Sequence, residues 1–198
     1  GVVSARLGCG TVNFLQQPAM DEKQLTGALA AGRDAVSRAV ERRAQLFIGG
    51  DMGIANTTAA PAVACALLDA DPGELAGPGT GLDSAGVSRK AELIRLALQR
   101  HRTSFTDSWQ VLRCVGGFEI AALAGAYIAC AQCGIPALVD GFITSAAALA
   151  ALRLPPDIAP WLFYAHTSAE PGHARILQAL GAKPLLKMGI RRAEWDGS

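Results

Sequence analysis

The chain has 198 residues, of which 51% are hydrophobic and 18% are charged, a composition typical of one well-buried domain and not of a disordered chain. Its net charge is +1, and the Lys and Arg residues are spread along the sequence without forming a basic block. Nothing therefore argues for a nucleic-acid partner. The apolar stretch 121–133 is followed at once by Gly134 and Pro136 and is shorter than the roughly 20 residues that cross a bilayer, so we expect no membrane span there.

The hydrophobic pattern predicts helices that alternate with short strands. In chain order the predictions are a helix over 18–43, a strand over 46–48, a helix over 56–68, a loop over 77–83, helices over 84–101, 107–114 and 118–133, a strand over 135–141, a helix over 144–152, a strand over 161–165, a helix over 174–180 and a strand over 184–188. In the helix over 56–68, Pro61 must lie in the first turns, where a missing amide hydrogen is tolerated.

This alternation predicts a single α/β domain over 1–198, with a parallel sheet flanked by helices on both faces in a Rossmann-like three-layer architecture. Such sheets bind ligands at the carboxyl ends of their strands. Polar turns follow three of the predicted strands, after Ile48, Val139 and Ala165. We therefore expect these turns to meet at one edge of the sheet and to form the functional site.

A glycine-rich run over 49–58, GGDMGIANTT, links the first predicted strand to the next helix. Gly50 and Gly53 permit tight or left-handed backbone, and the polar residues 56–58 bring donors to a helix start, where amide groups are unpaired. The run therefore predicts a phosphate site. It is neither a Walker A sequence nor the G-x-G-x-x-G fingerprint, and a plain strand-to-helix turn is the alternative.

The five cysteines form no regular framework, and the start of the chain lacks the basic and apolar regions of a signal peptide. We therefore expect a reducing, cytoplasmic location. Cys130 and Cys133 form a lone CxxC inside an Ala-rich predicted helix, with no second pair at zinc spacing. We expect structural thiols there and no metal site.

Six blocks in a fixed order carry a resemblance to a known family. They are 10–14 with 17–20, 50–60, 79–82 with 89–90, 115–121, 138–143 and 165–173. In these blocks the chain resembles the nicotinate-nucleotide:dimethylbenzimidazole phosphoribosyltransferases, which make the lower-ligand nucleotide of cobalamin. The resemblance covers essentially the whole chain.

The resemblance implies transfer of phosphoribosyl from nicotinate mononucleotide to 5,6-dimethylbenzimidazole or a related base, giving α-ribazole 5′-phosphate and nicotinate. The donor already carries a cationic pyridinium leaving group. The protein therefore needs to position phosphate and ribose and to remove a proton from the incoming nitrogen. No redox cofactor is required, and we expect no cofactor.

The family's general base is a glutamate near the end of its catalytic domain, and the resemblance places Glu194 at that position. Ala193 and Trp195 replace the glycines that flank this glutamate in the family, so an exposed charge on a frayed tail is the alternative for Glu194. Asp51 takes the place of an acidic residue at the entrance of the phosphate loop. It is the second catalytic candidate, to orient the incoming base or the ribose, and a carboxylate stabilised by a helix dipole is its alternative.

The resemblance also implies a set of substrate contacts on the loops that follow the strands and on one helix. These are Gly53, Ile54, Asn56, Thr57, Thr58, Thr80, Gly81, Lys90, Asp140, Ser168 and Gly172. Lys90 is expected to pair with the carboxylate or phosphate of the donor, and Asp140 with ribose hydroxyls. Ser168 and Gly172 are expected to form a second anion-binding turn. A helix cap, a turn cap or a solvated lysine is the alternative in each case.

Members of the family are longer than this chain, and we expect it to lack their N-terminal segment and C-terminal helices. The resemblance implies a homodimer whose other partners are small molecules. A non-catalytic nucleotide-binding or scaffolding fragment, or an enzyme for a different aromatic acceptor, are the alternatives. For His166 and His173, which flank the turn after the third strand, we expect structural or hydrogen-bonding roles.

Overall fold

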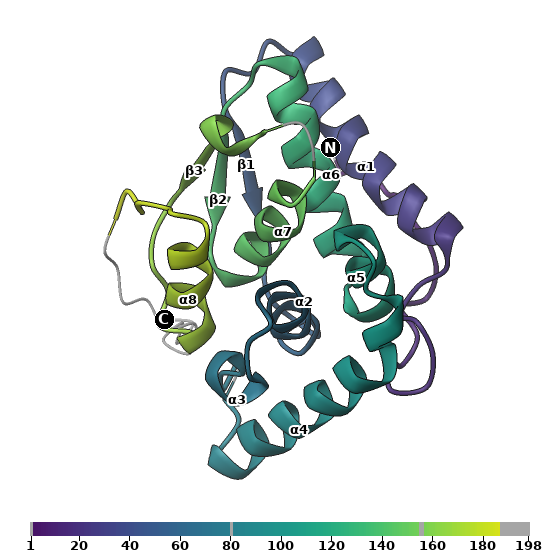
Figure 1. The fold of residues 1–198 in the computed structure, drawn as a ribbon. Helices are drawn as coiled ribbons and strands as arrows, with labels where there is room; N and C mark the ends of the chain where they lie inside the picture. The colour runs from purple at the N-terminus through teal and green to yellow at the C-terminus, as the bar shows by residue number, and fades with distance from the viewer. Residues whose placement is uncertain (1, 80, 155–156, 187–198) are drawn as a thin grey trace, which may run out of the picture.

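The structure is a computed structural model that describes residues 2–79, 81–154 and 157–186 (Figure 1). Helices make up most of it, and they accompany a small sheet. They are α1 (Glu22–Glu41), α2 (Ala59–Leu68), α3 (Pro72–Leu75), α4 (Ser84–His101), α5 (Ser108–Val115), α6 (Phe118–Cys133), α7 (Phe142–Leu152) and α8 (Pro171–Ala179), with the 3-10 turns η1 (Arg102–Ser104) and η2 (Ala159–Trp161).

The sheet contains β1 (Phe47–Gly50), β2 (Ala137–Asp140) and β3 (Leu162–Tyr164) in the order β1-β2-β3. All three strands are parallel, and Phe47, Ala137 and Leu162 lie side by side across them. Parallel strands need crossover connections, which the helices between them supply. The expected α/β class, with a parallel sheet flanked by helices, is confirmed.

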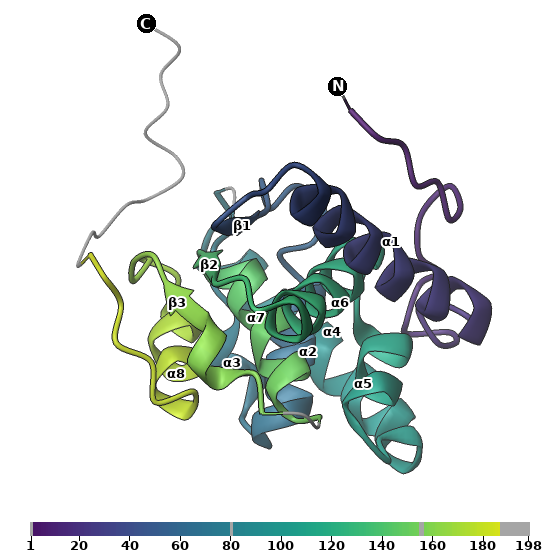
Figure 2. The same cartoon turned by 90° about the horizontal axis from the view of Figure 1, so that it is seen from above.

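The longest helix, α1, packs along α6 (Figure 2). Its buried residues Leu25, Ala28, Gly32 and Val36 follow helical spacing. A Cβ atom added at Gly32 would lie 1.8 Å from the carbonyl oxygen of Ala122 in α6. The small side chain is therefore what allows the two helix backbones to approach so closely.

The two faces of the sheet differ in burial. Gly49, Val139 and Tyr164 lie side by side on one face and are buried, with α6 and α7 in contact with the strands. On the opposite face Ile48 is 62% exposed and Phe163 is 46% exposed. The hydrophobic core of the described residues therefore lies between the first face and the helices.

Helix boundaries depart from the predictions mainly at N-termini. The helix predicted over 18–43 starts at Glu22, because Asp21 accepts a hydrogen bond from the Gln24 amide at 2.7 Å and forms a capping box. The helices predicted over 144–152 and 174–180 start earlier, at Phe142 and at Pro171. Proline is favoured in the first turn, where no hydrogen-bond donor is needed.

The strand predicted over 184–188 is not formed by its described residues, where Leu186 makes only an isolated parallel bridge with His166. The short helix α3 was not predicted, and it occupies the position where we expected only a helix-ending turn. In the described ranges, no helix combines the length and the apolar character that a membrane crossing needs.

Candidate functional site

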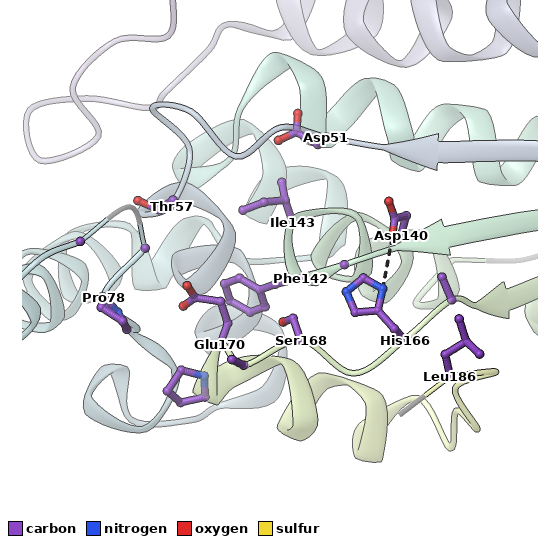
Figure 3. A pocket seen from close by; sticks show the side chains of 16 residues that line it. Asp51, Thr57, Pro78, Asp140, Phe142, Ile143, His166, Ser168, Glu170 and Leu186 are labelled. Atoms are coloured by element: carbon purple, nitrogen blue, oxygen red, sulfur yellow. Dashed lines mark ion pairs between the residues drawn. The ribbon is translucent and has the colours of Figure 1, made fainter. Parts of the chain in front are cut away.

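A cavity of about 840 Å³ lies at the carboxyl ends of the three strands (Figure 3). Asp51 follows β1, Asp140 ends β2 and Ser168 follows β3, and all three residues line the cavity. The predicted meeting of the three polar turns at one edge of the sheet is therefore confirmed. Thr57 and Gly81, also predicted as substrate contacts, line the same cavity.

The glycine-rich loop after β1 is folded around the carboxylate of Asp51. This carboxylate accepts hydrogen bonds from the Gly53 amide at 2.6 Å and from the Asn56 side-chain amide at 2.8 Å. Gly53 and Ala55 both have positive φ angles, of 72° and 63°, and a positive φ is uncommon outside glycine and marks strained, often functional, backbone. These two donors hold Asp51 in place in this structure, although they were expected to face phosphate.

A second, smaller cavity of about 350 Å³ is lined by residues 51–56 of this loop. Asp51 lines both cavities, whereas Gly53, Ile54 and Asn56 line only the second. Asn56 is buried, and its Oδ1 atom has no hydrogen-bond partner among the described residues. The predicted contacts of the glycine-rich loop are thus divided between two cavities that share Asp51.

A buried lysine lies next to Thr57 at one end of the larger cavity, although it does not itself line the cavity. Lys90 of α4 is only 6% exposed, and its ammonium donates to the Gly77 carbonyl at 2.9 Å and to Thr57 Oγ1 at 3.4 Å. Burial lowers the pKa of Lys90, and the nearby Glu170 carboxylate opposes that shift. A positive charge held in such surroundings favours binding of an anion next to it.

Glu170 borders the same end of the cavity, where Figure 3 shows it on the side of Thr57 and Pro78. A Cβ atom added at Gly77 would lie 2.0 Å from Glu170 Oε2, so the glycine makes room for this carboxylate. Sequence reasoning did not select Glu170 as a site residue. Its place in the polar turn after the third strand was the signal that could have identified it.

At the other end of the cavity, His166 Nδ1 lies 3.2 Å from Asp140 Oδ1 (Figure 3). The side chain of His166 is 17% exposed and that of Asp140 is 50% exposed. The carboxylate at the end of β2 is therefore held by a neighbouring side chain and is still open to a ligand. His166 is a second cavity residue that was not selected from the sequence.

His173 lies beneath the turn that carries Ser168, and it is 1% exposed. Its Nδ1 atom is 2.9 Å from the Ser168 amide nitrogen and 2.8 Å from Ser168 Oγ, and its Nε2 atom is 3.0 Å from Ser145 Oγ. Burial lowers the pKa of His173 to about 4, with a further contribution from His166. The expected hydrogen-bonding role of His173 is confirmed.

Several predicted site residues lie elsewhere. Thr58 precedes α2 and lines neither cavity. Gly172 also lines neither, and a Cβ atom added there would lie 2.8 Å from the Leu75 carbonyl oxygen, which makes close packing of α8 against α3 its evident role. Thr80 and Glu194 fall outside the described residues. The functional roles of these four residues, like those of the other predicted site residues, remain predictions.

The part of the chain that the structure describes holds no cluster of three or more His, Cys, Asp or Glu side chains suited to a metal ion. Of the CxxC pair, Cys130 is buried and Cys133 is exposed. Burial raises the pKa of Cys130 to about 12, which leaves its thiol protonated at neutral pH and unreactive.

Comparison with known proteins identifies the family. The sequence model of the family DBI_PRT, described as phosphoribosyltransferase, matches residues 2–198. A Pseudomonas putida protein named "Nicotinate-nucleotide--dimethylbenzimidazole phosphoribosyltransferase" is 60% identical over 198 residues, which are 100% of this chain and 56% of that protein. A Pseudomonas aeruginosa protein of the same name is 56% identical with the same coverage.

A crystal structure of CobT from Thermus thermophilus matches the fold with a TM-score of 0.91 and 40% sequence identity. The match covers 96% of this chain and 57% of that chain. This chain thus spans little more than half the length of the relatives that it matches. On the match over residues 2–198 and the shared fold, the chain belongs to the phosphoribosyltransferase family DBI_PRT.

Proposed function

We propose that this chain forms the donor-nucleotide site of an enzyme that transfers phosphoribosyl from nicotinate mononucleotide to 5,6-dimethylbenzimidazole or a related base. The products are α-ribazole 5′-phosphate and nicotinate. The observation that carries the proposal is the cavity at the strand ends, which is lined at one end by Thr57, the partner of the buried Lys90 ammonium, and at the other by the Asp140 carboxylate. The names of the relatives from Pseudomonas support the choice of substrates.

The phosphate of the donor is proposed to bind beside Lys90. The ammonium already holds Thr57 and the Gly77 carbonyl, and a phosphate oxygen next to it would form a charge-assisted hydrogen bond. The loop around Gly79 and Gly81 lines the adjoining part of the cavity and brings backbone within reach of that phosphate. Lys90 and the loop thus replace the second anion-binding turn as the proposed phosphate site.

The ribose is proposed to lie between the two carboxylates that border the cavity, Asp140 and Glu170. Ionised carboxylates only accept hydrogen bonds, so they suit the ribose hydroxyls and not the phosphate. In this arrangement the phosphate lies toward Lys90, and the sugar spans the cavity. This placement leaves the glycosidic carbon facing the space next to Asp51.

The proposed reaction is a displacement at the ribose C1′ carbon. The bond from C1′ to the pyridinium nitrogen breaks, and its electron pair returns to that nitrogen. The product is nicotinate with a neutral ring nitrogen. The lone pair of the incoming imidazole nitrogen forms the new bond from the opposite face, which converts the β-nucleotide into an α-ribotide. The proton on the other imidazole nitrogen passes to a carboxylate base.

Glu194 remains the proposed general base, by its resemblance to the family's glutamate. Asp51 is proposed to orient the incoming base or the ribose, because its carboxylate is fixed by Gly53 and Asn56 and faces both cavities. The enzyme is further proposed to be a cytoplasmic homodimer. The alternative is a fragment that binds the nucleotide without turnover.

The test combines two measurements on this chain. Calorimetric titration with nicotinate mononucleotide measures donor binding, and mass spectrometry after addition of 5,6-dimethylbenzimidazole detects the ribotide. Binding with product formation is the expected result. Binding without product would select the non-catalytic alternative, and the absence of binding would contradict the proposed donor site.

A further inference from the structure

A buried histidine links the turn after β3 to the helix that follows β2. His173 belongs to α8, Ser168 to the cavity-lining turn, and Ser145 to α7. Ser145 and His173 are 28 residues apart in sequence, and both are buried. The connection therefore fixes the position of the cavity wall relative to the core.

The hydrogen bonds determine which nitrogen of His173 carries the proton. An amide can only donate, so the hydrogen bond from the Ser168 amide to Nδ1, at 2.9 Å, requires Nδ1 to be unprotonated. In the neutral ring the proton is then on Nε2, which donates to Ser145 Oγ at 3.0 Å. Ser168 Oγ, at 2.8 Å from the same Nδ1, can interact with it only by donating its hydrogen.

This arrangement changes what Ser168 offers to a ligand. Its amide hydrogen is directed at His173 and is not available to a phosphate. Its hydroxyl hydrogen can share the single Nδ1 lone pair with the amide, and the oxygen then presents its own lone pairs and acts as an acceptor. Such an acceptor complements the hydroxyl groups of a sugar, and it would meet an anion unfavourably.

We propose that His173 is a positioning residue, which holds Ser168 as a hydrogen-bond acceptor toward the ribose of the nucleotide. This inference rests on the donor site proposed above. His173 itself does not line the cavity, so its effect on the ligand passes through Ser168. Ser145 completes the hydrogen-bond network, because its Oγ accepts a hydrogen bond from Nε2 and so keeps Nδ1 as the acceptor.

The surroundings favour the neutral ring that this role needs. The rings of His166 and His173 are 6.1 Å apart, and Phe142 packs on another side with its centroid at 6.3 Å. His166 is in turn paired with Asp140. No carboxylate of the described residues is paired with His173 to stabilise a second proton.

The first test is spectroscopic and does not depend on any ligand. An NMR spectrum of the ring nitrogens in isotopically labelled protein at neutral pH is expected to show His173 with a protonated Nε2 and an unprotonated Nδ1. A protonated Nδ1 would overturn the inference. This result is independent of whether the chain binds nicotinate mononucleotide.

The second test measures donor affinity by calorimetry in His173→Leu, Ser168→Ala and the double variant. Each single variant is expected to weaken binding roughly threefold to tenfold, the range for loss of one hydrogen bond. The double variant is expected to bind the donor as well as the weaker-binding of the two single variants does, because both changes remove the same interaction. Additive losses, or an unchanged affinity in His173→Leu, would overturn the inference.

Two further variants separate positioning from stability. His173→Asn keeps an acceptor for the Ser168 amide and is expected to recover part of the affinity, even if His173→Leu folds poorly. His101→Leu is the matched control, since His101 is also buried and hydrogen-bonded, to the Phe14 carbonyl, yet lines neither cavity. It is expected to lower stability and to leave affinity unchanged. If the wild type binds no donor, the proposed function fails, and the NMR result alone decides the tautomer.

Discussion

Replacement of Lys90 by methionine tests the proposed phosphate site directly. The ammonium is buried and already bonded to Thr57 and Gly77, and methionine has a similar length without charge. Removal of a buried cation relieves its desolvation, while the Gly77 carbonyl loses a donor. Because these effects oppose each other, we expect the free energy of unfolding of the unliganded protein to change by about 1 kcal/mol or less.

Donor binding is expected to change far more than stability. A hydrogen bond between charged partners contributes about 1.5–3 kcal/mol, so the loss of Lys90 should raise the Kd for nicotinate mononucleotide roughly 10-fold to 100-fold. The pH dependence should change as well. Burial lowers the pKa of Lys90 from its ordinary value of 10.5. The ammonium therefore loses its proton at a lower pH than an exposed lysine does, and the affinity of the wild type for the donor should start to fall at that lower pH.

The assay is calorimetric titration of the donor between neutral and alkaline pH, with thermal unfolding measured in parallel. Lys23→Met is the matched control, because Lys23 is exposed on α1 and lines neither cavity. The Lys90→Met variant should lose the alkaline decrease that the wild type shows. Equal affinity of Lys90→Met and wild type would refute the placement of phosphate beside this lysine.

Three other predictions concern the proposed base, the packing of α1 on α6 and the buried His173. Glu194→Gln should abolish ribotide formation and leave donor binding intact, and unchanged turnover would remove Glu194 from the role of base. Gly32→Ala should lower the free energy of unfolding by roughly 1–3 kcal/mol through overpacking, because the new Cβ would lie 1.8 Å from a backbone oxygen of α6. Gly50→Ala should be tolerated, because its nearest neighbour, Asp140 Oδ2, lies 4.0 Å from the new Cβ. Chemical denaturation of the two variants compares them. His173 has its pKa lowered from 6.5 to about 4, so the unfolded chain binds a proton that the folded chain does not, and stability should fall as pH decreases through this window by up to about 3 kcal/mol. Denaturation of wild type and His173→Asn at several pH values measures this, and parallel curves would contradict it.

The order of helices and strands could be read from the sequence because it depends on local patterns. The helix predicted over 107–114 begins at Ser108, because the Asp107 carboxylate caps it by accepting a hydrogen bond from the Gln110 amide at 2.9 Å. The helix over 84–101 has its predicted bounds, with Asp83 as the cap at its start. Periodicity and capping act within a few residues, so the sequence alone carries them.

The edge of the sheet that carries the cavity was also predictable, because parallel strands bring their carboxyl ends together whatever their exact register. That rule by itself predicts that Asp51, Asp140 and Ser168 lie near one another. It could not say how each polar group would be satisfied. The glycine-rich loop closes on Asp51, and this internal bonding was not visible in its sequence.

Only the tertiary structure decided which distant side chains meet inside the site. Lys90 contacts Thr57 across 33 residues of chain, and His173 joins Ser145 across 28. These contacts result from the packing of helices on one another, α4 on α2 and α3 and α8 on α7, and burial then shifts the pKa of Lys90 and of His173. Local patterns determined the elements of this protein, whereas long-range packing determined which of their side chains form the site.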